Sequence, residues 1–342
     1  MAVSVRNPDA NVARVLRVSI TGDCNLNCFY CKPTGRQADL LRPKTLIQPS
    51  DLTKLVKIVG ELGVRRVLIS GGEPLLRKDA ANFVKSAYAH KGIEEVRLVT
   101  NGTFLKSFGD QLRKLGLKKV DVNFDTLNFL KFQRITGSDS LYRVLDGIEK
   151  VERLHFSEVR LNVYLLPGVN EDEIINFSRL TKDRPLHLRF IEYAPKNGGL
   201  YKGPERAFAV QDAKRIIDNY QALSAAPQPQ TAPDPLDVRS PSFRFVDAVG
   251  RISFVTKEAL FAEHAIPRVL LSAQGTLSNE ALPNKSLALV EDLRKDAKDI
   301  NLHKAIEKVL MLGPTPSIYT QKKTERKAPP ASKRSRMAEA QL

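Results

Sequence analysis

The stretch GDCNLNCFYC, residues 22–31, contains every cysteine of this chain: Cys24, Cys28 and Cys31. Their spacing, C-x3-C-x2-C, gathers the thiols in one short segment. An ordinary electron-transfer [4Fe–4S] cluster takes four cysteine ligands, so a set of three thiolates leaves one iron open. The segment therefore predicts one [4Fe–4S] cluster whose open iron binds a substrate or cofactor, and it predicts chemistry at that cluster.

Other roles for these cysteines stay open at this point. A structural zinc site would need a fourth cysteine or a histidine, and the nearest histidine, His90, is far along the chain. A disulfide framework would need an even number of cysteines and a secreted protein. Inert thiols are the remaining alternative. Three cysteines rarely fall so close together by chance, which favours the cluster.

Length and composition indicate a protein that crosses no membrane. The chain has 342 residues and is 42% hydrophobic, enough for one large domain or two domains with a substantial core. No apolar run approaches the ~20 residues that span a bilayer, and residues 1–15 lack the apolar stretch of a signal peptide. We therefore expect a cytoplasmic protein, in the reducing environment that an oxygen-sensitive cluster needs.

The first two-thirds of the chain alternates strand-like and helix-like patterns. Apolar runs predict strands at residues 15–20, 67–70, 96–100, 119–124, 159–165 and 186–191. Amphipathic stretches predict helices at residues 49–62, 79–90, 104–115, 140–154 and 170–182. Six β/α units of this length indicate the α/β class and an incomplete parallel (β/α)6 barrel. A smaller C-terminal α+β region follows.

Polar residues lie at the ends of several predicted strands, which is where a parallel barrel carries its active site. They could instead cap the helices that follow. Their convergence on one barrel face favours a site. These residues are Thr100, Asn101, Asn123, Asp125, Asn162, Arg189 and Glu192.

We expect four parts in the chain. They are an N-terminal arm (1–13), the partial barrel (14–195), a C-terminal region that covers the barrel's open side (196–312, with a proline-rich loop at 226–235) and a basic disordered tail (313–342). In the C-terminal region we expect helices at 210–220, 285–295 and 302–310, and strands at 243–247, 251–255 and 268–272. The basic tail resembles a nuclear signal or a nucleic-acid tail, although a solvated tail without a specific reader is favoured.

The formal charge of +16 exceeds what the tail supplies, because residues 322–336 contain seven Lys or Arg and one Glu. A basic body favours an anionic ligand such as a phosphorylated small molecule or a nucleotide. Nucleic-acid binding stays open but is unsupported, since the sequence contains no recognisable RNA-binding module or aromatic stacking motif.

The chain resembles the radical S-adenosylmethionine (SAM) enzymes. The cysteine motif has the family's aromatic residue, Tyr30, before the last cysteine, and Gly71-Gly72-Glu73-Pro74 follows at the family's distance. The resemblance implies that SAM binds the open iron, that Tyr30 lies near the adenine and that the GGEP backbone binds the methionine amine. It also implies that Thr100, Asn101 and Asn123 contact SAM. A reducing donor such as flavodoxin or ferredoxin would supply the electron that cleaves SAM to a 5′-deoxyadenosyl radical.

More specific motifs resemble the molybdenum-cofactor GTP 3′,8-cyclase family, from about residue 14 to residue 312. They include RVSITGDCNLNCFYCKP, RRVLISGGEPLLRKD, LVTNGT, LNVYLLPGVNEDEI, LRFIEYAP and GRISFVT. The resemblance implies substrate-binding roles for Arg17, Arg160, Arg189 and Arg268, where Arg160 stands at a family lysine. Each of these could instead form a surface ion pair. Permanently charged guanidinium groups suit phosphate binding.

The chain also departs from that family. The family has a second three-cysteine cluster, and our alignment places Glu263, Ile266 and Glu280 at those positions. Leu68 and Leu270 replace family arginines. We therefore expect a divergent paralogue, a radical SAM enzyme that abstracts hydrogen from an anionic, nucleotide-like small molecule. The alternatives are modification of a peptide or other macromolecule, or a non-catalytic relative that binds nucleic acid or protein.

Overall fold

The computed structural model describes residues 15–31, 46–193, 208–227, 241–256, 268–279, 285–296 and 298–311. The chain divides into two compact units, Met1–Leu312 and Gly313–Leu342, and all described residues belong to the first. The expected N-terminal arm, most of the proline-rich loop and the basic tail lie outside the described residues. Within the described residues, no helix is both long and apolar enough to cross a bilayer.

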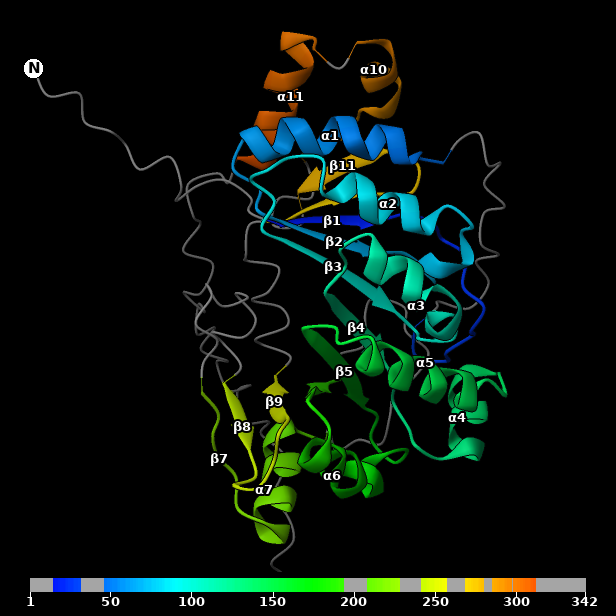
Figure 1. Cartoon of the computed structure of the whole chain (residues 1–342), viewed down its shortest axis with the longest axis vertical. Helices are drawn as coiled ribbons and strands as arrows, with labels where there is room; N and C mark the ends of the chain where they lie inside the picture. The colour runs from blue at the N-terminus through cyan, green and yellow to red at the C-terminus, as the bar shows by residue number, and fades with distance from the viewer. Residues whose placement is uncertain are drawn as a thin grey trace, which may run out of the picture. The chain divides into compact units, whose positions relative to one another are not determined.

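The six strands expected from the sequence form the parallel centre of one twelve-stranded sheet (Figure 1). Each strand pairs in parallel with the next along the chain, and the α/β class and partial barrel are confirmed. The strands are β1 (Val15–Ser19), β2 (Arg66–Ser70), β3 (Glu95–Thr100), β4 (Lys119–Asn123), β5 (Glu158–Leu165) and β6 (Leu186–Glu192).

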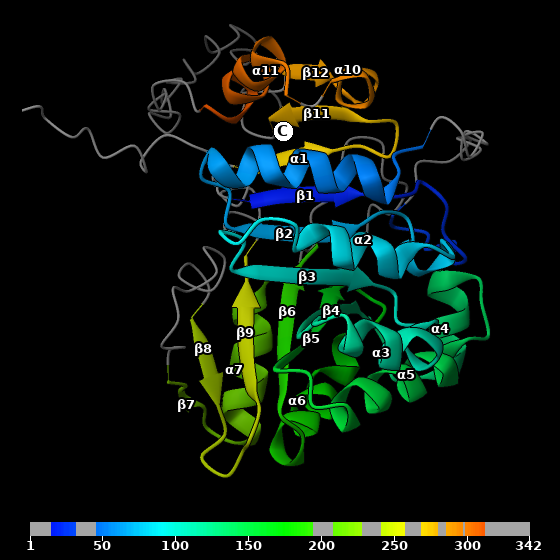
Figure 2. The same cartoon turned by 45° about the horizontal axis from the view of Figure 1, so that its top comes forward.

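Helices cover the outer face of this sheet (Figure 2). Each buries an apolar stripe against the strands, as α5 does with Leu141, Val144, Ile148 and Val151. The expected helices are α1 (Pro49–Glu61), α2 (Ala80–Ala87), α3 (Leu105–Lys114), α5 (Leu141–Arg153), α6 (Ile174–Asp183) and α7 (Val210–Tyr220). Two short 3-10 helices, η3 (Pro74–Leu76) and η4 (Glu171–Glu173), precede α2 and α6.

One helix of the barrel region was not predicted: α4 (Phe129–Thr136). It begins at Asn128, whose side chain accepts a hydrogen bond from the backbone N–H of Lys131 at 3.0 Å. It ends at Gly137, which has a left-handed φ of 68°. Two turns are too few for a clear apolar period, which is why the sequence pattern did not identify it.

The C-terminal strands extend the sheet at both edges. Beside β6 lie β9 (Arg251–Val255), β8 (Ser242–Arg244) and β7 (Ser224–Ala225), and beside β1 lie β10 (Arg268–Leu271), β11 (Thr276–Asn279) and β12 (Ser286–Ala288). The pairs β1–β10 and β6–β9 are parallel, so both continue the barrel wall. The last helices are α10 (Val290–Lys295) and α11 (Ile300–Leu310).

Two expectations for this region were wrong in their bounds. The strand expected at 243–247 ends at Arg244, because a turn begins there, with Ala248 N donating to the Phe245 carbonyl at 3.1 Å. The helix expected at 285–295 begins as strand β12, and only its second half is helical. Pairing with β11 overrides the local helical pattern at Ser286–Ala288.

The two faces of the central strands differ sharply in polarity. Alternate side chains of a strand point to opposite faces. On β5, Leu161 and Val163 join the apolar core under the helices, while Arg160, Asn162 and Tyr164 share the other face. The inner face of the partial barrel is therefore polar along this strand, as a binding site requires.

Candidate functional site

The cysteine loop follows β1 at the carboxyl end of the sheet and lies against α4 (Figure 1). Asn27 N donates to the Thr136 carbonyl at 2.8 Å, and Phe29 N donates to the Ile135 carbonyl at 3.1 Å. These bonds satisfy carbonyls at the end of α4 that have no partner within the helix. The helix that was not predicted thus holds the segment that carries Cys28.

The GGEP segment packs directly on the first part of the cysteine loop, at Thr21 and Asp23. Gly72 N donates to the Thr21 carbonyl at 2.8 Å, and Glu73 N donates to the Asp23 carbonyl at 2.7 Å. A Cβ on Gly72 would lie 2.1 Å from the Asp23 oxygen, and one on Gly71 would lie 2.6 Å from the Thr21 oxygen. The close approach of two backbones explains both glycines. The carbonyls of the segment are the groups that suit an ammonium ligand.

Glu73 joins the GGEP segment to the end of β3. Its carboxylate is fully buried and accepts hydrogen bonds from Thr100 Oγ1 (2.7 Å), Asn101 N (2.7 Å) and Leu75 N (3.0 Å). Burial raises the pKa of Glu73, while these hydrogen bonds act in the opposite direction. The carboxylate therefore acts within the protein as a clamp between two strand ends.

Asn101 continues this chain of contacts to the cysteines. Its Nδ2 lies 3.8 Å from Cys24 Sγ and donates to Asn25 Oδ1 at 2.9 Å. Such a hydrogen bond to a ligand sulfur tunes the potential of an iron–sulfur cluster. The structure thus brings Cys24, Glu73, Thr100 and Asn101 together, as expected from their positions at strand ends.

Three tyrosines form an aromatic wall beside the loop. The Tyr30 ring centroid lies 5.7 Å from that of Tyr164 and 6.0 Å from that of Tyr193. The Tyr30 hydroxyl donates to Asp125, and Asp125 also accepts from Tyr164 N at 2.8 Å. Burial raises the pKa of Asp125 to about 6. Tyr164 and Tyr193 were not predicted, although Tyr164 follows Arg160 and Asn162 at inward positions of β5.

The side chains of Asn123 and Asn162 pair across β4 and β5. Asn162 Nδ2 donates to Asn123 Oδ1 at 3.1 Å. The Oδ1 of Asn162 is buried and has no hydrogen-bond partner among the described residues. Because buried acceptors are nearly always satisfied in folded proteins, this oxygen is suited to a donor on a bound molecule.

The predicted arginines lie at different depths of the barrel. Arg17 is half-buried and donates through Nε to Ser70 Oγ at 3.3 Å. Arg189 is buried. The burial of Tyr164 raises the pKa of this tyrosine, while the nearby charges of Arg17 and Arg189 act in the opposite direction. Arg160 pairs with Glu158 at 3.2 Å, nearer the amino ends of the strands. Arg268 is buried at the amino end of β10, in register with Val15.

A buried ion-pair network forms the floor of the barrel and was not predicted. Arg97 pairs with Asp121 at 2.7 Å and with Glu158 at 2.5 Å, and Arg251 pairs with Glu158 at 2.5 Å. His187 contacts Glu158 and also Ser253, but Ser253 is only 1% exposed. The serine is therefore a buried member of this network. Charged residues at alternate positions of β3 to β6 were the available signal.

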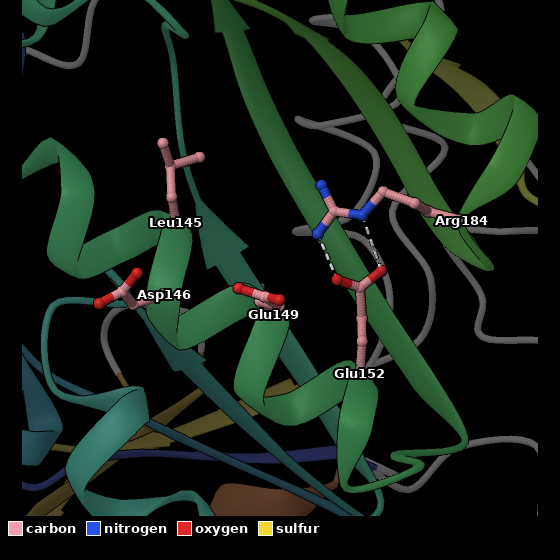
Figure 3. A pocket seen from close by; sticks show the side chains of 5 residues that line it. All are labelled: Leu145, Asp146, Glu149, Glu152 and Arg184. Carbon is pink, nitrogen blue, oxygen red and sulfur yellow. Dashed lines mark hydrogen bonds and ion pairs between the residues drawn. The ribbon is translucent and has the colours of Figure 1, made fainter.

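A hollow of about 290 Å³ lies elsewhere, on the outer layer of helices (Figure 3). It is lined by α5 side chains and by Arg184, which pairs with Glu152. The cysteines and the GGEP segment contribute nothing to its lining. It is therefore unrelated to the site at the carboxyl end of the sheet.

The three thiols of the cysteine loop lie near one another and supply the sulfur donors that an iron–sulfur cluster takes. Burial raises the pKa of Cys28, and Asp125, Cys31 and Cys24 each raise it further, so the three thiols lie within electrostatic reach of one another. No group of three or more Cys, His, Asp or Glu in the described part of the chain is close enough to hold one ion.

The family is decided by sequence similarity. Residues 18–181 match the model of the radical SAM superfamily. A GTP 3′,8-cyclase of Alkaliphilus metalliredigens is 30% identical over 290 residues, which cover 83% of this chain and 86% of that protein. The chain belongs to the GTP 3′,8-cyclase family of radical SAM enzymes. The resemblance expected from the cysteine and GGEP motifs is thus confirmed.

Two further comparisons bear on the extent of the chain and on its fold. Molybdenum cofactor biosynthesis protein moc-5 of Caenorhabditis elegans is 33% identical over 300 residues, which cover 86% of this chain and 48% of that protein. This chain therefore spans about half the length of that relative. The crystal structure of Streptococcus suis SuiB bound to S-adenosylmethionine matches with a TM-score of 0.55 at 16% identity, over 87% of this chain and 68% of SuiB. At that identity the match supports the fold alone.

Proposed function

We propose that this radical SAM enzyme holds one [4Fe–4S] cluster through Cys24, Cys28 and Cys31. We further propose that it abstracts hydrogen from an anionic, nucleotide-like small molecule. One observation carries the proposal: backbone hydrogen bonds join the cysteine loop to the GGEP segment and to α4, at the carboxyl end of a barrel with arginines on its inner face. Parallel barrels carry their active sites at that end.

When bound, the cluster and SAM supply a 5′-deoxyadenosyl radical that removes a hydrogen atom from the substrate. The protein's own residues hold and orient both molecules. The Gly71 and Gly72 carbonyls suit the SAM ammonium, and the Tyr30 ring suits the adenine. The orphan Oδ1 of Asn162, beside Asn123, accepts a donor from the ribose or the substrate. These contacts fix the position from which the radical acts.

Arg17 and Arg189 bind the anionic group of the substrate in this proposal, with Arg160 and Arg268 adding positive charge from deeper in the barrel. A guanidinium group stays charged at any pH that proteins tolerate, and a site with little water strengthens its attraction for an anion. We propose flavodoxin or ferredoxin as the electron donor, and a reducing, cytoplasmic setting.

The chain differs from its relatives in a way that bears on the product. All three of its cysteines lie in the first cluster motif, so this chain offers no cysteine ligand for a second cluster. We propose that the substrate is recognised by side chains alone and that it is not GTP in the relatives' binding mode. The enzyme is then a divergent paralogue with an altered reaction.

Substrate-triggered SAM cleavage tests this function. Reconstituted enzyme, SAM and dithionite are incubated with nucleotides and phosphorylated metabolites, and 5′-deoxyadenosine is quantified by mass spectrometry. An active substrate raises the yield in the wild-type enzyme, and Arg17→Ala or Arg189→Ala abolishes that rise while leaving the basal cleavage. If no anion raises the yield, the substrate class is wrong. If even the basal cleavage is absent, the radical SAM activity itself is wrong.

A further inference from the structure

The surroundings of Arg17 on the inner face of the barrel point to a narrower substrate class. Arg17 is in register with Leu68 on β2 and with Leu270 on β10, so a leucine flanks it on each neighbouring strand. Alternate side chains of each strand share a face. Leu68 and Leu270 therefore lie on the same face as the guanidinium group.

These leucines do not belong to the apolar core. Their sequence neighbours Val67, Ile69, Val269 and Leu271 are fully or almost fully buried in it, under the helices. Leu68 and Leu270 are only half-buried and stand outside that core, as the described residues define it. Val99 on β3 is likewise half-buried and outside it. Leu68, Val99 and Leu270 lie at inner-face positions of β2, β3 and β10, and we name these three side chains the apolar wall.

Arg17 has binding capacity left on this wall. Its Nε donates to Ser70 Oγ at 3.3 Å, and the described residues give Nη1 and Nη2 no hydrogen-bond or ion-pair partner. Two other arginines of the barrel are engaged with carboxylates: Arg97 with Asp121 and Glu158, and Arg160 with Glu158. Two free guanidinium nitrogens suit one carboxylate or one phosphate group.

We propose that the substrate carries one anionic group on an apolar body, and that it is not a nucleoside triphosphate. Arg17 binds the anion, and the apolar wall binds the adjoining hydrocarbon or ring. A triphosphate bound by Arg17 would bring part of its further charge beside Leu68 and Leu270, which cannot replace the lost hydration of that charge. This inference rests on the proposed function, because it concerns the substrate site of the same reaction.

Binding to the reconstituted enzyme with SAM tests the inference directly. Isothermal titration calorimetry compares phenyl phosphate, inorganic phosphate and GTP at equal ionic strength. Burial of the phenyl ring on the apolar wall should make phenyl phosphate bind at least about tenfold tighter than inorganic phosphate or GTP. Equal affinities, tighter binding of GTP, or no binding of phenyl phosphate at millimolar concentration would overturn the proposal.

Variants separate the two halves of this site. Leu68→Ala with Leu270→Ala should weaken phenyl phosphate several-fold and leave inorganic phosphate unchanged, whereas Arg17→Met should weaken both. Leu270→Arg should shift the preference toward GTP. Leu130→Arg is the matched control, because it adds the same charge on α4 at a side chain that is 71% exposed. A variant pattern without these differences would contradict the assignment of the wall and of Arg17.

These results stay interpretable if the proposed function fails. The calorimetry measures binding and not turnover, so it needs neither reductant nor SAM cleavage. If no 5′-deoxyadenosine forms but the ligands bind in the expected order, the proposed radical reaction is contradicted and the proposed substrate site is supported. If SAM is cleaved and GTP binds most tightly, the proposed radical reaction is supported and the proposed substrate class is contradicted.

Discussion

Replacement of Gly72 by alanine tests the packing of the GGEP segment on the cysteine loop. A Cβ at this position would lie 2.1 Å from the Asp23 oxygen, 2.5 Å from the Asp23 carbonyl carbon and 2.7 Å from the Gly22 oxygen. All three are backbone atoms of the loop, so no side-chain rotation relieves the clash. The loop itself must move, by about 1 Å, before the contact becomes tolerable.

That displacement has a calculable effect on stability. It would break the hydrogen bonds from Gly72 N to the Thr21 carbonyl (2.8 Å) and from Glu73 N to the Asp23 carbonyl (2.7 Å). Each such bond contributes about 1 kcal/mol, and overpacking adds about 1–3 kcal/mol, for a total of about 3–5 kcal/mol. For a domain of this size the melting temperature should fall by roughly 6–15 °C. The cysteines would also lose their positions as ligands.

Calorimetry of the metal-free protein and iron analysis after reconstitution measure the two effects. Gly22→Ala is the matched control: it lies in the same loop, and a Cβ there would meet nothing within 4 Å. The control should keep the wild-type melting temperature and iron content, while Gly72→Ala should lower both. A Gly72→Ala variant with unchanged stability and iron content would refute the described packing.

Three further predictions follow from individual contacts. Arg97→Leu leaves Asp121 and Glu158 without a buried partner and should lower the free energy of unfolding, measured in urea, by about 3–5 kcal/mol. Arg153→Leu, at an exposed pair, should change it by less than about 0.5 kcal/mol. Equal effects of the two variants would contradict the buried network. The pKa of Asp125 rises from 3.8 to about 6 on folding, so between these pH values the native state holds a proton that the unfolded chain has lost. The free energy of unfolding should therefore fall by about 3 kcal/mol as the pH rises from about 4 to about 6. Asp125→Asn should remove this slope from urea midpoints of the metal-free protein, and an unchanged slope would assign it to other groups. Asn101→Ala removes the hydrogen bond to Cys24 and should lower the cluster's midpoint potential by about 20–60 mV in an EPR-monitored titration. The control Asn219→Ala, at an exposed position of α7, should leave the potential unchanged. Equal potentials of the Asn101→Ala variant and the wild-type enzyme would exclude the contact.

The sequence predicted the six central strands because their apolar runs are buried under helices and are separated by amphipathic stretches of helical period. It missed β7, β11 and β12, which have two to four residues each and derive their structure from pairing with a neighbour. Periodicity needs more residues than such strands contain. Helix α4 failed for the same reason, although its carbonyls hold the cysteine loop.

The candidate site was predictable where a motif names its chemistry, as for Cys24, Cys28, Cys31 and Tyr30. The roles of Glu73 and Asn101 within the protein were not, because they depend on contacts between segments that lie 28 residues apart in the sequence. The ion-pair floor around Glu158 joins β3, β5 and β9, and no local pattern reveals such a meeting. The register of Arg17 with Leu68 and Leu270 also emerged only from the sheet.

The most direct test of a single-cluster radical SAM enzyme is native mass spectrometry of the anaerobically reconstituted chain, followed by a SAM-cleavage assay on the same sample. We predict the mass of one [4Fe–4S] cluster per chain, 5′-deoxyadenosine on addition of dithionite, and neither with Cys28→Ala. One zinc ion per chain, no bound metal, or a full cluster without any 5′-deoxyadenosine would contradict the account.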